Sequence, residues 1–103
     1  MNTKKSAAMK FLDELVGTPQ SFGDMLENIR ECDELSQKEF AKKLKISPSH
    51  LCDIEKNRKV VSPERAARFA KILGYSQPIF VKYAIQAMLD QAGLKFKVEL
   101  VAA

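Results

Sequence analysis

The chain has 103 residues, of which 46% are hydrophobic and 29% charged, so we expect one soluble globular domain with a modest core. No apolar run approaches the length of a membrane span, and the N-terminal segment lacks the apolar centre of a signal peptide, which predicts a cytoplasmic protein without a membrane partner. Two cysteines without zinc-ligand spacing and a single histidine predict no metal site, and no motif indicates a cofactor.

The net charge of +4 is unevenly distributed along the chain. Residues 21–36 carry five acidic side chains against one basic, whereas residues 37–71 carry ten basic side chains against four acidic. A polyanion such as duplex DNA would be attracted to the second segment, because binding neutralises phosphates and releases their counterions. A solvated lysine-rich face is the alternative explanation.

Two amphipathic helices are predicted before residue 35. The first covers residues 4–16, and its apolar side chains recur at helical spacing: Ala8, Phe11, Leu12 and Leu15. We expect residues 1–20 to form a helical extension that docks on the core or on a partner. Ser21 then caps a second helix, whose inward side chains are Phe22, Met25, Leu26 and Ile29. Its outer face is acidic and should point away from DNA.

A pair of short helices is predicted next. Ser36 and Glu39 have the spacing of a capping box, which starts the first helix. Ser47 is an N-cap residue and Pro48 suits the first position of the second helix, which Asn57 ends. Only about three residues separate the helices, so they must turn sharply and pack through one set of apolar side chains: Ala41, Leu44, Ile46, Leu51 and Ile54. This is the helix-turn-helix arrangement.

Four short stretches carry a resemblance to a known family. They read LSQ, EFAKKLKIS, SHLCDIEKN and SPE, and together they resemble the DNA-binding domain of the phage repressor and Cro proteins, the Xre family. The resemblance covers about residues 22–75, and it departs at Asn57, where most members carry glycine. It implies a DNA-binding domain over residues 21–76.

The remaining helices follow from further caps and stops. Ser62 and Pro63 start a helix that Gly74 ends, and its apolar residues complete the core. The segment 79–92 opens after Pro78, and ten of the sixteen residues 77–92 are apolar, so more than one side of this helix needs burial. The predicted fold class is therefore all-α: a five-helix repressor-like domain with an extra N-terminal helix and one short C-terminal strand.

That strand is predicted from the alternation of apolar and charged side chains in residues 94–100. A lone strand leaves backbone groups unpaired, so we expect it to pair with the same strand of a second copy. Residues 77–103 would then form the dimerisation unit, with an interface of Phe80, Tyr83, Ala84, Met88, Leu94, Phe96, Val98 and Leu100. Binding of the strand to a different protein is the alternative.

In a helix-turn-helix the second helix enters the major groove with its N-terminal residues toward the bases. The predicted base-contacting residues are Pro48, Ser49, His50 and Asp53, of which the family resemblance implies all but His50. The alternative for His50 is an ordinary surface position, and the alternative for Asp53 is a local ion pair with Lys56. The predicted phosphate-contacting residues are Gln37, Lys38, Lys42, Ser47, Lys56, Arg58 and Lys59, with Arg65 and Arg68 as weaker candidates.

These residues predict a sequence-specific regulator of transcription, most simply a homodimeric repressor that binds a palindromic operator in double-stranded DNA. The alternative is an antitoxin that neutralises a toxin protein and represses its own operon. An enzyme is not expected. Ser49 and His50 are neighbours on one helix and point about 100° apart, so they cannot form a hydrogen-bonded catalytic line.

Overall fold

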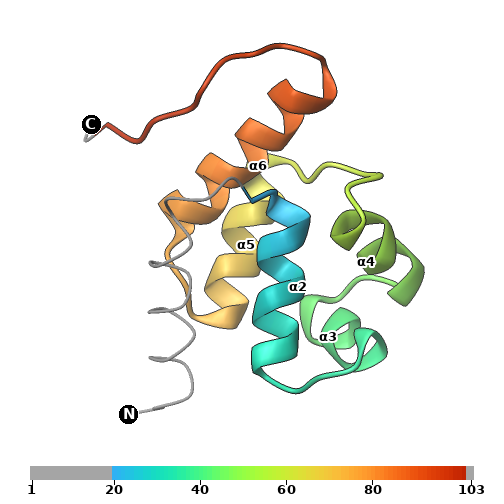
Figure 1. The fold of residues 1–103 in the computed structure, drawn as a ribbon. Coiled ribbons are helices and arrows are strands. Elements are labelled where there is room, and N and C mark those ends of the chain that lie inside the picture. Colours follow the sequence, from blue (N-terminus) through green and yellow to red (C-terminus); the bar gives the residue numbers. More distant parts are fainter. Residues whose placement is uncertain (1–19, 102–103) are drawn as a thin grey trace.

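The computed structural model describes residues 20–101, which form five helices and, within that range, no strand (Figure 1). The helices are α2 (Phe22–Cys32), α3 (Gln37–Leu44), α4 (Pro48–Glu55), α5 (Pro63–Leu73) and α6 (Gln77–Gln91). The all-α, five-helix prediction is thus confirmed for this part of the chain. The predicted N-terminal helix, residues 4–16, lies outside the described residues.

Serine side chains determine where the helices begin. Each helix is preceded by a serine whose hydroxyl accepts a backbone N–H three residues further on: Ser21, Ser36, Ser47, Ser62 and Ser76. The capping box predicted for Ser36 and Glu39 is present. Asn57 after α4 and Gly74 after α5 adopt left-handed conformations, with φ of 61° and 78°. The predicted starts of α2 to α5 are confirmed because these signals are local, whereas α6 begins at Gln77, two residues before the predicted start at Ile79.

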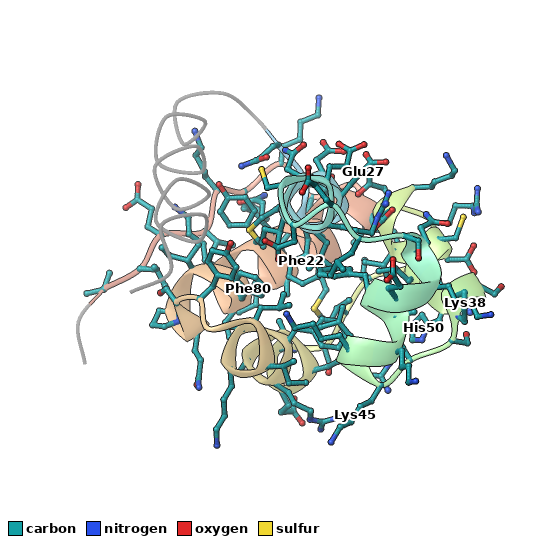
Figure 2. All side chains as sticks on the ribbon, turned by 90° about the horizontal axis from the view of Figure 1, so that it is seen from below. Phe22, Glu27, Lys38, Lys45, His50 and Phe80 are labelled. Carbon is teal, nitrogen blue, oxygen red and sulfur yellow. The ribbon has the colours of Figure 1, made fainter. Side chains whose placement is uncertain are left out.

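The core lies between α2, α5 and α6, with α3 and α4 packed against α2 and α5 (Figure 1). Phe80 of α6 meets Phe22 of α2 edge to face, with ring centroids 5.9 Å apart, and stacks on Tyr75. Figure 2 shows both phenylalanines in the interior. Phe80 and Ala84 are fully buried in this chain. They therefore belong to its own core and not, as predicted, to a surface that a second copy can touch.

The predicted C-terminal strand is not formed within the described chain. Residues 94–101 run as an extended segment beside α6, without strand pairing. A strand requires a neighbouring strand for its ladder, and residues 20–101 provide none. The side chain of Gln86 holds the segment instead, through the backbone of Phe96 and Val98. Dimer pairing of this segment therefore remains a proposal.

Two further observations concern the described residues only. No helix within 20–101 is both long and apolar enough to cross a membrane. The same range contains no group of three or more histidine, cysteine, aspartate or glutamate side chains that could hold a metal ion.

Candidate nucleic-acid interface

The turn between α3 and α4 is tight. Lys45 ends α3 in a left-handed conformation, with a φ of 62°, and the backbone N–H of Ile46 donates to the carbonyl oxygen of Ala41 at 3.0 Å. Ser47 then caps α4 directly. Below the turn the two helices pack through buried apolar side chains of both: Phe40, Ala41, Leu44, Leu51 and Ile54. The predicted helix-turn-helix geometry is therefore present.

The start of α4 is exposed to solvent. The hydroxyl of Ser47 accepts the backbone N–H of His50 at 3.0 Å, and Pro48 occupies the first turn, where its missing N–H leaves no gap in the helix. Ser47, Pro48 and Ser49 are all exposed, and His50 is half-buried. Four residues predicted to contact DNA thus lie together at the positive end of a helix dipole.

Exposed cationic side chains lie on α3, on the turn and in the loop after α4. Figure 2 shows Lys38, Lys45 and His50 on the same side of the molecule, on α3, the turn and α4. The exposed lysines and arginine of this region are Lys38, Lys42, Lys43, Lys45, Lys56, Arg58 and Lys59. Lys43 and Lys45 were not among the predicted phosphate contacts, although the basic run of residues 42–45 contained the signal.

The pKa of His50 is shifted by positive charges near the start of α4. Its pKa is lowered, first by burial and then by the positive charges of Arg65 and Lys59, while Asp53 opposes the shift. Arg65 lies in the first turn of α5, so a third helix brings a cation to the start of α4. From the sequence, Arg65 was only a weaker candidate for phosphate contact, because only the tertiary fold brings it near His50.

Asp53 is already paired in the free protein. Its Oδ1 accepts from Nε of Arg58 at 2.9 Å, and its backbone carbonyl accepts the N–H groups of Arg58 and Lys59 at 2.8 and 3.2 Å. The hydrogen bond with Asp53 raises the pKa of the Arg58 guanidinium. The alternative pairing of Asp53 with Lys56 is wrong, because the loop after α4 folds back and brings Arg58 to the carboxylate.

A buried ion pair joins the motif to α2. Nε and Nη2 of Arg30 donate to the two carboxylate oxygens of Glu55 at 2.8 and 3.2 Å, and the Glu55 side chain is only 1% exposed. The amide of Gln37 also donates to Glu55, at 2.9 Å, and Arg30 donates to the carbonyl oxygen of Leu35 at 3.0 Å. The hydrogen bond with Glu55 raises the pKa of the Arg30 guanidinium. One carboxylate thereby connects α2, α3 and α4.

Sequence reasoning missed this network. Gln37 was predicted to hold a phosphate at the start of α3, and its amide nitrogen is engaged with Glu55 in the free protein. Glu55 follows Leu51 at helical spacing on the inward face of α4, which was the available signal for burial. The partner, Arg30, lies 25 residues away in the chain.

Comparison with known proteins agrees with this geometry. A family model described as helix-turn-helix matches residues 26–76, a range that includes α3, α4 and α5. Comparison with curated proteins found no match. Members of the matched family are DNA-binding regulators. The exposed start of α4, the basic residues near it and the family match lead to one conclusion: residues 26–76 of this chain form a domain of the Xre/Cro-type helix-turn-helix family.

Proposed function

We propose that the chain is a sequence-specific repressor that reads the major groove of double-stranded DNA with the first turns of α4. The observation that carries this proposal is the exposed, serine-capped start of α4, with exposed cationic side chains on α3, on the turn and in the loop after α4. A helix of this kind presents its N-terminal residues to base edges while the preceding helix crosses the backbone.

The base contacts follow from the chemistry of each exposed group. Ser49 donates to or accepts from a base, and Pro48 offers apolar contact to a thymine methyl group. His50 adds a donor at the edge of the site. Asp53 accepts from a cytosine amino group only by sharing its carboxylate with Arg58. Bases opposite this pair are therefore read by Asp53 and Arg58 together.

The phosphate contacts position the motif. Gln37 and Ser47 lie at helix N-termini, where backbone N–H groups also face an anion. The cationic contacts are Lys38, Lys42, Lys56, Arg58 and Lys59, all of them exposed. Each neutralised phosphate contributes about 0.9 to the slope of log affinity against log salt.

Selection of bound sequences from a random duplex pool tests the proposal. The chain should enrich one motif, and a homodimer should enrich two inverted half-sites with centres about one helical turn apart, or a multiple of it. Fluorescence anisotropy on the selected duplex should show that Lys59→Ala weakens all sequences alike, whereas Ser49→Ala changes the preferred base. Lys82→Ala on α6 is the matched control and should leave affinity unchanged. Absence of any preference among duplexes at low salt would contradict the proposal.

Neutralisation of a toxin protein is the second candidate function. It is favoured by the exposed apolar side chains after α6, of which Phe96 is 65% and Leu100 51% exposed. Co-expression with the neighbouring gene separates the two candidates. Recovery of a stoichiometric complex that relieves growth arrest supports the antitoxin function, whereas recovery of this chain alone supports the repressor.

A further inference from the structure

Arg58 is held through both its backbone and its side chain. Asn57, just after α4, adopts a left-handed conformation and turns the chain back toward the helix. The carbonyl oxygen of Asp53 then accepts the N–H groups of Arg58 and Lys59 at 2.8 and 3.2 Å. Nε of Arg58 donates to Oδ1 of Asp53 at 2.9 Å, and Nη2 of Arg58 contacts Sγ of Cys52 at 3.6 Å. The guanidinium is therefore oriented before DNA is bound.

These side-chain contacts occupy only one edge of the guanidinium. An arginine side chain carries five N–H donors, one on Nε and two on each Nη nitrogen. Nε and one N–H of Nη2 point along the edge that faces Asp53 and Cys52. Within residues 20–101, Nη1 has no hydrogen-bond partner, and the Arg58 side chain is 56% exposed. Nη1 and the second N–H of Nη2 thus form an exposed fork of two parallel donors.

The fork lies near the base-contact candidates of α4. Asp53 follows Ser49 by four residues, so the two side chains lie on the same face of the helix. A guanidinium bonded to Asp53 extends that face beyond the reach of the aspartate itself. In Figure 1 the loop after α4 lies beside α4, on the side of the molecule that carries α3. The fork is therefore placed for the same groove as Ser49.

A base edge suits this fork better than a phosphate group does. The carboxylate of Asp53 offsets the charge of Arg58 and would repel a phosphate brought beside it. Contact with a base edge depends on directed donors, which the ion pair leaves in place. In the major groove, guanine presents two acceptors side by side, N7 and O6, whereas adenine, thymine and cytosine each present at most one acceptor. Two parallel donors therefore match guanine.

We propose that Arg58 recognises a guanine in the major groove, with Nη1 and Nη2 donating to N7 and O6, and that Asp53 is its positioning residue. This inference rests on the proposed function, and it assigns Arg58 to a base and not to a phosphate. Orienting the guanidinium in the free protein reduces the side-chain entropy that is lost on binding. Arg58 is thereby a specificity-determining residue, whereas the neighbouring Lys59 contacts a phosphate.

Replacement of single guanines by 7-deazaguanine tests the contact, because this base lacks the N7 acceptor and keeps O6. Fluorescence anisotropy measures affinity for the duplex selected from the random pool. At one guanine of the bound site, the replacement should weaken binding of the original chain about fivefold. Arg58→Ala should weaken binding to the unmodified duplex about tenfold, and the same replacement should then cost less than about twofold. Lys59→Ala is the matched control and should retain the loss of about fivefold.

Asp53→Ala tests the positioning role. It leaves the charge of Arg58 without its carboxylate partner, so binding to a duplex that lacks the selected motif should not weaken. The loss caused by 7-deazaguanine should nevertheless fall below about twofold, because the guanidinium is no longer oriented. Thermal unfolding should be nearly unchanged, since this ion pair lies at the surface.

Failure of this inference is distinguishable from failure of the proposed function. A selected motif without guanine, or a 7-deazaguanine loss that persists in Arg58→Ala, overturns the base contact. A loss that persists in Asp53→Ala overturns the positioning role. Absence of any preferred duplex overturns the proposed function, and this inference with it.

Discussion

Replacing Glu55 with glutamine should destabilise the folded chain by about 3 kcal/mol. The carboxylate accepts three hydrogen bonds, two from Arg30 at 2.8 and 3.2 Å and one from Gln37 at 2.9 Å. Glutamine keeps the shape but offers one acceptor oxygen, and its NH₂ group faces donors. The substitution also removes the buried counter-charge of the Arg30 guanidinium and leaves it only the more distant carboxylate of Glu27, 3.9 Å away.

The magnitude follows from burial. Removing one partner of a buried ion pair typically costs about 3–5 kcal/mol. The Glu55 side chain is 1% exposed, but that of Arg30 is 14% exposed, so water compensates part of the loss and places the expected value at the lower end. A domain of this size is stabilised by about 5–15 kcal/mol in total. The midpoint of thermal unfolding should therefore fall by about 12–24 °C.

Urea denaturation followed by circular dichroism measures this change. Glu64→Gln is the matched control, since Glu64 is exposed in the first turn of α5 and its removal should cost less than about 1 kcal/mol. The combined change Arg30→Met and Glu55→Leu should cost less than the sum of the single changes, because neither charge remains unpaired. A Glu55→Gln loss no larger than that of Glu64→Gln would refute the reasoning.

Three further predictions concern α2 and α4. Gly23→Ala should destabilise the chain by about 1–3 kcal/mol in the same denaturation assay, because a Cβ there collides with the backbone carbonyl of Ile54 and forces α2 away from α4; an unchanged midpoint would contradict this close packing. Asn57→Gly should stabilise by up to about 1 kcal/mol, since Asn57 has a φ of 61° that glycine adopts without strain; a loss of stability would show that the asparagine side chain contributes more than the strain costs. In the folded chain the pKa of His50 lies below its ordinary value of 6.5. When the pH falls through 6.5, the unfolded chain therefore binds more protons at His50 than the folded chain does, and the folded chain loses stability. His50→Gln should therefore lose less stability than the original chain between about pH 7.5 and about pH 5.5, and equal losses would refute the assigned shift.

Much of the fold could be predicted because its signals are local. Ser36 with Glu39, and Ser47 with Pro48, define helix starts through bonds that span three residues or fewer. The helix-turn-helix and the exposed base-contact candidates at its second helix follow from these starts. The charge distribution likewise needs no tertiary information to indicate which segment would attract DNA.

The parts that could not be predicted depend on partners distant in the chain. The burial of Glu55 is offset by Arg30, 25 residues away, and Asp53 pairs with Arg58 because the loop after α4 folds back. Phe80 and Ala84 are apolar residues that suit a core or a dimer interface equally well, and the packing of α6 on α2 and α5 placed them in the core.

The amino-acid sequence by itself determined the helix starts and the basic segment, because each depends on side chains a few positions apart. Only the tertiary structure decided which charges are buried, which cations act on His50 at the start of α4, and that Gln86 bonds to the backbone of Phe96 and Val98. Those features depend on contacts between residues far apart in the chain, and the periodicity of apolar residues along the sequence carries no information about such contacts.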